Sequence, residues 1–207
     1  MLCLKVPTDA AWADEALTNV DALLVDHAHC EMKAAANALS LAARDQGDIE
    51  TAVVLADLAR EEIDHFQRVL AELSARAAAL GPPPVDAYAA DLRRAPHDLP
   101  HDPKIGPKVD RFLVAALIEA RSCERFKLLA RACAARDVYA ALGSLWEELF
   151  AAEAGHYRSF VELAVRAAGG DREAVAARLD RLADREAAIV EGLGRRAHGR
   201  RRTTIHG

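Results

Sequence analysis

Aromatic residues are scarce in this chain of 207 residues, and long apolar runs are absent. Aromatics make up 5% of the sequence, whereas Ala and Leu are abundant, which is typical of a helical bundle and not of a sheet protein. No stretch approaches the roughly 18 consecutive apolar residues of a membrane span, and the N-terminus lacks the apolar core of a signal peptide. We therefore expect a cytoplasmic all-α protein with no membrane contact.

Cysteine is also sparse, and its spacing excludes several kinds of site. Cys3, Cys30, Cys123 and Cys133 include no Cys-x-x-Cys pair. This argues against a zinc knuckle and against a rubredoxin-type iron centre. We expect four buried thiols in a reducing compartment, with no disulfide framework.

Glycine and proline divide the chain into long helical segments. The periodicity of apolar residues predicts helices at about 19–46, 48–80, 108–136, 137–169 and 171–193. The expected N-caps of the second, fourth and fifth of these are Asp48, Asp137 and Asp171. Most of the eight prolines fall in 81–107, which reads as a long crossover with a short helix near 86–92. This order predicts a ferritin-like four-helix bundle with one long crossover and an additional C-terminal helix. We expect one domain over 1–194 and a basic tail over 195–207.

Two Glu-x-x-His steps are the most informative motif. Glu62 and His65 form the first, and Glu153 and His156 form the second. Because residues i and i+3 share a helix face, each step directs a carboxylate and an imidazole to one side. Both steps fall on apolar stripes, where a carboxylate alone would be costly to bury. Two such steps, with one Glu from each of two other helices, form the ligand set of a dinuclear iron or manganese site.

The first of the two remaining ligands is expected on the helix at 19–46. Glu31 is the best candidate there, because small and apolar residues flank it on its face. The nearby His27 and Asp26 are expected either to support the ligands or to lie at the surface.

The helix at 108–136 offers two acids, Glu119 and Glu124. A weak internal repeat aligns Glu124 with Glu31. Hairpin geometry favours Glu119, because antiparallel helices place residues opposite each other when they are equidistant from the turn. We prefer Glu119 and keep Glu124 as the alternative.

Four carboxylates and two imidazoles are hard oxygen and borderline nitrogen donors, which suit iron or manganese. We expect two iron ions as cofactor and dioxygen as co-substrate, while the protein supplies ligand geometry, a dry pocket and a substrate path. The ligand set alone does not distinguish C–H oxidation, iron oxidation and storage, or peroxide reduction.

The segments around these residues strongly resemble the bacterial MiaE family. The resemblance is carried by DHAHCEMKAA (26–35), LAREEIDHF (58–66), IEARSCERF (118–126) and EAGHY (153–157). Members of that family are tRNA hydroxylases that act on 2-methylthio-isopentenyladenosine beside the anticodon. The resemblance implies a non-haem di-iron monooxygenase that hydroxylates the isopentenyl group with dioxygen and two electrons, which an electron-donating reductase would supply. The implied metal ligands are Glu31, Glu62, His65, Glu119 (or Glu124), Glu153 and His156.

The C-terminal tail is basic in a chain whose formal net charge is −5. Arg-rich segments bind the RNA backbone and often become ordered on binding. We expect the tail to contact the anticodon stem-loop of tRNA, although a solvated, frayed terminus is the alternative. The expected RNA-binding residues are Arg195, Arg196, Arg200, Arg201 and Arg202.

Other ferritin-like di-iron proteins are alternatives. A quinone-precursor hydroxylase shares the ligand pattern but should carry an apolar membrane-facing helix, which is not evident here. A ferroxidase or iron-storage protein would assemble into cages. A metal-free helical adaptor would purify without iron.

Overall fold

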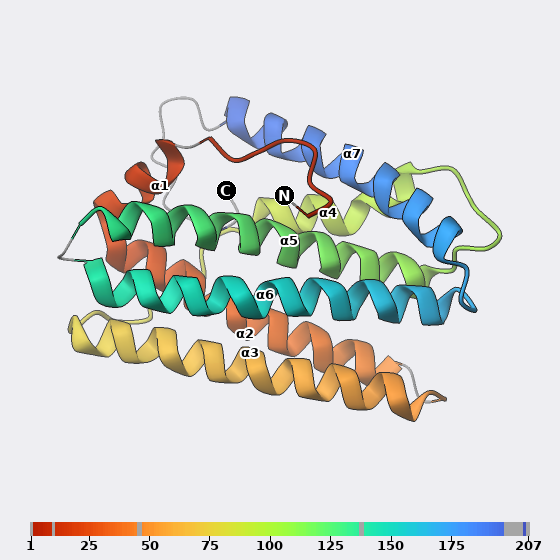
Figure 1. The fold of residues 1–207 in the computed structure, drawn as a ribbon, viewed down its shortest axis with the longest axis horizontal. Helices are drawn as coiled ribbons and strands as arrows, with labels where there is room; N and C mark the ends of the chain where they lie inside the picture. Colours follow the sequence, from red (N-terminus) through yellow and green to blue (C-terminus); the bar gives the residue numbers. More distant parts are fainter. Residues whose placement is uncertain (1, 10, 45–46, 137–138, 197–204, 206–207) are drawn as a thin grey trace. The chain divides into compact units, whose positions relative to one another are not determined.

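A computed structural model describes residues 2–9, 11–44, 47–136, 139–196 and 205 of the chain, with side chains described through residue 193 and at residue 205. Its described part is helical and contains no strand, so the all-α prediction is confirmed (Figure 1). The α-helices are α1 (Ala11–Ala16), α2 (Val20–Arg44), α3 (Ile49–Ala75), α4 (Ala87–Arg94), α5 (Pro107–Ala134), α6 (Ala140–Ala167) and α7 (Arg172–Arg196). Short 3-10 turns, η1 (Leu17–Asn19) and η2 (Ala95–Asp98), follow α1 and α4.

The chain forms two compact units, each built on one helical hairpin. One unit runs from Ala16 to Val85, includes Ile205 and contains the α2–α3 hairpin. The other comprises the N-terminal residues through Glu15 and the chain from Asp86 through α7, and it contains the α5–α6 hairpin. The predicted domain boundary at residue 194 lies within α7 and stays a prediction.

The α2–α3 hairpin closes at an aspartate cap. The Asp48 side chain accepts a hydrogen bond from the Thr51 backbone N–H at 3.1 Å and another from the Thr51 hydroxyl at 2.7 Å. At its other end α3 stops at Ala75, earlier than the predicted residue 80. The reason is Ala77, which takes the left-handed conformation with φ 52°. Because this conformation usually falls to glycine, the helix end could not be predicted from an alanine.

Glycine and aspartate mark the helix ends of the other unit as predicted. Pro107 opens α5 at a position where its missing N–H costs nothing. Beyond α6, Gly169 and Gly170 have φ values of 66° and 91°, which L side chains rarely adopt. The Asp171 side chain then accepts a hydrogen bond from the Ala174 backbone N–H at 3.0 Å and caps α7.

The crossover contains the short helix that the sequence predicted. Asp86 caps α4 by accepting from the Ala89 backbone N–H at 3.0 Å. In the same unit α4 contacts α7, so the additional C-terminal helix covers part of the crossover. Asp137, the predicted N-cap of α6, lies outside the described residues.

The expectation of four buried cysteines is half correct. All four are free thiols, but only Cys123 and Cys133 are buried, while Cys3 and Cys30 are partly exposed. Among the described helices, none combines the length and the apolar character needed to cross a bilayer.

Candidate metal centre

The α2–α3 hairpin brings three predicted ligands together. Glu31 on α2 and Glu62 and His65 on α3 are all buried, and each offers a ligand atom within 4.8 Å of the others. The Nδ1 atom of His65 lies 3.4 Å from Glu62 Oε2 and 3.8 Å from Glu31 Oε2. We call these three residues the α2–α3 cluster. It joins one Glu-x-x-His step to one carboxylate from the neighbouring helix.

The α5–α6 hairpin repeats this arrangement. Glu119 on α5 and Glu153 and His156 on α6 are buried, and their ligand atoms also lie within 4.8 Å of one another. The Nδ1 atom of His156 is 3.4 Å from Glu153 Oε2, the same spacing as in the first Glu-x-x-His step. We call these three residues the α5–α6 cluster.

The acid Glu124, the alternative to Glu119, has other partners. Its carboxylate accepts hydrogen bonds from the Thr8 backbone N–H at 3.0 Å and from the Thr8 hydroxyl at 2.8 Å. It also forms an ion pair with Arg121 on the same helix. The geometry therefore groups Glu119, and not Glu124, with the second Glu-x-x-His step.

His27 and Asp26, which precede Glu31 on α2, are both buried. His27 has no exposed surface, and its Nε2 atom lies 2.5 Å from Glu31 Oε1. Asp26 is 4% exposed and accepts a hydrogen bond from the Ile205 backbone N–H at 2.5 Å. The expectation that these residues lie at the surface is wrong for both. The alternative was that they support the ligands, and His27 does contact the predicted ligand Glu31. The i, i+4 spacing of His27 and Glu31 was the available sign of their contact.

Each cluster fits a metal ion by its donor chemistry. In each cluster two carboxylates and an imidazole lie within 4.8 Å of one another and are shielded from water, so the two negative charges repel each other unless a cation or protons compensate them. Carboxylate oxygen and imidazole nitrogen are donors that iron and manganese accept, and a thiolate is absent from both clusters. Either cluster can hold one such ion with three protein ligands.

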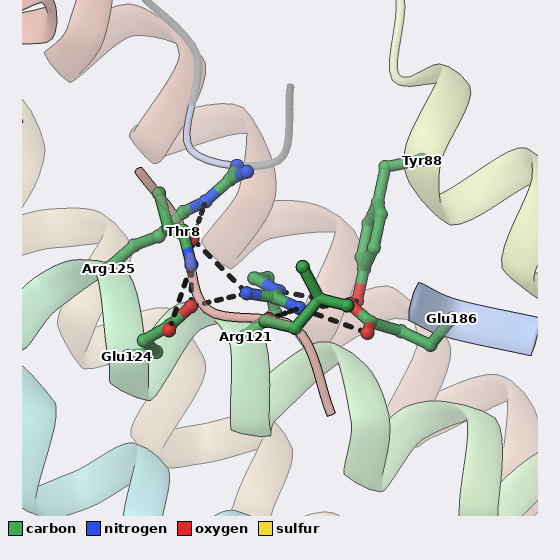
Figure 2. Close-up of polar contacts among 7 residues, drawn as sticks. Thr8, Tyr88, Arg121, Glu124, Arg125 and Glu186 are labelled. Atoms are coloured by element: carbon green, nitrogen blue, oxygen red, sulfur yellow. Dashed lines mark hydrogen bonds and ion pairs between the residues drawn. The ribbon is translucent and has the colours of Figure 1, made fainter. Parts of the chain in front are cut away.

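A buried ionic network on α5 was not anticipated from the sequence (Figure 2). Arg121, two residues beyond Glu119, has no exposed surface, and its guanidinium donates to both oxygens of the fully buried Glu186 on α7 at 2.8–3.0 Å. The Tyr88 hydroxyl donates to the same carboxylate at 3.0 Å. Burial raises the pKa of Tyr88 well above its ordinary value, and the Glu186 charge adds to that rise. The network ties α5 to α4 and α7.

The same network holds the N-terminal segment. Arg121 donates to the Val6 carbonyl at 3.0 Å and to the Thr8 hydroxyl at 3.1 Å. The neighbouring Arg125 stacks on the Trp12 ring at 5.0 Å, and burial lowers the pKa of Arg125 to about 10. These contacts hold the N-terminal segment against α5 (Figure 2).

The predicted RNA-binding tail lies at the edge of the described structure. Arg195 and Arg196 belong to the last turn of α7, but their side chains are outside the described part. Arg200, Arg201 and Arg202 lie outside the described residues altogether. Their contact with RNA stays a prediction.

Comparisons with known proteins agree with this geometry. The model of the family described as tRNA-(MS[2]IO[6]A)-hydroxylase (MiaE) matches residues 1–198. The tRNA 2-(methylsulfanyl)-N(6)-isopentenyladenosine(37) hydroxylase of Pseudomonas putida is 38% identical over 161 residues, which cover 78% of this chain and 74% of that protein. The Salmonella typhimurium protein of the same name is 26% identical, with 90% of this chain and 83% of that protein covered.

A solved structure shares the fold. It is described as Protein 43 with aldehyde deformylating oxygenase activity from Synechococcus, and it matches with a TM-score of 0.84 and 35% identity. The match covers 100% of this chain and 96% of that one, and it confirms the ferritin-like class predicted from the sequence. The predicted family is confirmed as well, because its model matches nearly the whole chain and a curated member is 38% identical. The chain therefore belongs to the MiaE family of tRNA hydroxylases.

Proposed function

We propose that this protein hydroxylates the isopentenyl group of 2-(methylsulfanyl)-N6-isopentenyladenosine at position 37 of tRNA, next to the anticodon. The observation that carries the proposal is the pair of buried clusters, each a Glu-x-x-His step with one further Glu, in a chain of the MiaE family. Both curated relatives bear this activity in their names.

Each cluster would hold one of the two iron ions of the di-iron cofactor expected from the sequence. When bound, the iron ions would supply the activation of dioxygen. One oxygen atom is inserted into a C–H bond of the substrate, and the other is reduced to water by two electrons and two protons. An electron-donating reductase would provide the electrons. The residues that would hold the iron are Glu31, Glu62, His65, Glu119, Glu153 and His156.

The chain's own residues contribute position and exclusion of water. The i, i+3 spacing aims each carboxylate and imidazole at the same point, and the buried surroundings keep bulk water from the donors. Apolar neighbours on the same helix faces, such as Leu58 on α3 and Leu149 on α6, are 5% exposed or less. Apolar side chains beside the donors suit an isopentenyl group better than a polar substrate.

The substrate would reach the protein as part of a folded tRNA. A base must leave its stack to reach a buried reaction centre, and a base in the anticodon loop leaves it at low cost. The basic tail (Arg195, Arg196 and Arg200–Arg202) would grip the anticodon stem through its phosphates. A cytoplasmic location follows from this substrate.

Mass spectrometry of nucleosides tests the proposed reaction. The iron-loaded, reduced protein is incubated with oxygen and with tRNA that carries the isopentenyl modification. A gain of one oxygen atom on this nucleoside, lost in the His65→Ala variant, supports the proposal. The absence of any gain with every reductant tried, in a protein shown to hold iron, contradicts it.

The likeness to the Synechococcus structure favours a second candidate, deformylation of an aldehyde. The same reduced protein can be offered an aldehyde in a parallel reaction. Aldehyde turnover without tRNA modification would reassign the function while it leaves the metal centre in place.

A further inference from the structure

A residue near the C-terminal end of the chain packs against α2. Ile205 has no exposed surface, and its backbone N–H donates to Asp26 Oδ2 at 2.5 Å. The two residues are 179 positions apart in the sequence, yet both belong to the compact unit that contains the α2–α3 hairpin. Asp26 is itself buried, so this contact is shielded from water.

Both the side chain and the backbone of Ile205 favour this docked position. Ile205 is the one large apolar residue of the basic tail 195–207, and burial of an isoleucine side chain favours docking by about 10–100-fold. A buried carboxylate needs hydrogen-bond donors, and a bond to such an acceptor is about twice as strong as one between neutral groups. The Ile205 N–H is a strong donor to Asp26 Oδ2, whereas the Cys30 thiol, 4.0 Å from the same oxygen, is a weak one.

We propose that Ile205 is an anchor that presents the basic segment Arg200–Arg202 to tRNA as a loop attached at both ends. This inference rests on tRNA as the substrate, as proposed above. On one side of the segment α7 ends at Arg196, and on the other side the docked Ile205 follows. Attachment of both ends lowers the entropy that the segment loses when it binds RNA phosphates. A frayed terminus would have no such docked residue.

The anchor lies close to the α2–α3 cluster. Asp26 precedes Glu31 by five residues on α2, which is about 7–8 Å along the helix axis. His27, the residue after Asp26, contacts Glu31 Oε1 at 2.5 Å. An extended chain spans at most about 3.6 Å per residue, so an anchor three residues after Arg202 restricts that arginine to the neighbourhood of this cluster. The phosphates bound there would then flank the base that reacts.

Four variants of the full-length protein separate the anchor from its surroundings. Ile205→Ser removes the buried side chain, and Ile205→Val keeps a β-branched apolar one. Asp26→Ala removes the acceptor on α2. Val85→Ser is the matched control, because Val85 belongs to the same unit but is 88% exposed. The arginines of the tail are intact in all four.

Hydrogen–deuterium exchange measures the docking in the absence of RNA. A backbone N–H that is hydrogen-bonded in the interior exchanges only when its contact opens. After correction for intrinsic rates, we expect the C-terminal peptide of Ile205→Ser and of Asp26→Ala to exchange about 10–100-fold faster than that of the wild type. Ile205→Val loses one methylene group and should stay within about fivefold of the wild type, which Val85→Ser should match.

Binding of an unmodified tRNA transcript with adenosine at position 37, followed by fluorescence anisotropy at several salt concentrations, measures the consequence. Ile205→Ser and Asp26→Ala should lose about 2–10-fold in affinity, because the loop must then be ordered in the binding step. The slope of log affinity against log salt should stay as in the wild type, because the phosphate contacts remain. Far-UV circular dichroism shows whether Asp26→Ala is folded, and Ile205→Ser tests the anchor without a change to α2.

Three results would overturn the inference. Exchange as slow in Ile205→Ser as in the wild type would show that this residue is not docked in solution. Faster exchange with unchanged affinity for tRNA would separate the anchor from RNA binding, and a higher affinity would make the docked end an obstacle to RNA. A wild-type protein that binds no tRNA but keeps the slow exchange would instead refute the tRNA partner of the proposed function, and with it this role of the docked end.

Discussion

The buried pair of Arg121 and Glu186 should dominate the stability of the unit that contains α5 and α7. Both side chains are completely buried, and Glu186 accepts three hydrogen bonds from the guanidinium and one from Tyr88. The perturbation is Glu186→Ala, which removes the carboxylate and leaves the Arg121 charge in the interior.

The expected cost follows from the partners that remain. Removal of one member of a buried ion pair typically costs about 3–5 kcal/mol, because the other charge stays desolvated. Arg121 keeps Glu124 and the Val6 carbonyl, so the lower end of this range applies. A loss of about 3 kcal/mol corresponds to a fall in Tm of about 6–12 °C for a protein of this size. Glu186→Gln keeps an acceptor for Tyr88 without the charge. Its free energy of unfolding should lie between those of Glu186→Ala and the wild type.

Urea unfolding of the metal-free protein, followed by circular dichroism, measures this cost without a contribution from bound metal. The matched control is Glu162→Ala, which breaks the exposed pair with Arg172 and should leave the unfolding midpoint nearly unchanged. If Glu186→Ala shifts the midpoint no further than Glu162→Ala does, the buried network is not a source of stability and this reasoning is wrong.

Three further predictions concern the cap, the ligands and the tail. Asp48→Ala should lower the free energy of unfolding by about 1 kcal/mol because α3 loses its N-cap, whereas Asp48→Asn should retain most of it in the same urea assay. Glu119→Ala should reduce the Co²⁺ bound per chain in equilibrium dialysis, whereas Glu124→Gln should not; the reverse result would restore Glu124 as the ligand. The plot of log affinity for tRNA against log salt has a negative slope. Replacement of Arg200–Arg202 by Ser should make this slope shallower by about 2–3, because three expected phosphate contacts are lost. An unchanged slope would assign tRNA binding to another surface.

The helices could be predicted because their ends depend on local chemistry. Asp48 and Asp171 cap helices where the sequence predicted, and Gly169 and Gly170 end α6. The end of α3 could not be predicted in the same way. There an alanine adopts a left-handed conformation that its own preference disfavours, and only the surrounding structure specifies it.

The cluster residues were predictable for a related reason: the spacing of a motif fixes its geometry on a helix and across a hairpin. The contact between His27 and Glu31 is also a matter of spacing, but an i, i+4 pair of His and Glu is common on helix surfaces and carries no information about burial. The buried network of Arg121 could not be predicted from the sequence. Its other members, Glu186, Tyr88 and Val6, are distant from Arg121 in the chain, and no periodicity links them.

The network also explains why Glu124, which the weak internal repeat aligns with Glu31, does not lie in the α5–α6 cluster. Cys30-Glu31 and Cys123-Glu124 match as letters, yet Glu31 contacts His27 and His65 while Glu124 contacts Thr8 and Arg121. The unit with α5 carries an N-terminal segment that the unit with α2 lacks, and this segment needs an acceptor on α5. Glu124 meets that need, so the carboxylate of the α5–α6 cluster comes from Glu119, where the distance from the hairpin turn matches the Glu-x-x-His step on α6. Distance along a hairpin reports what two helices share in space, whereas a repeat of letters reports only what they share in sequence.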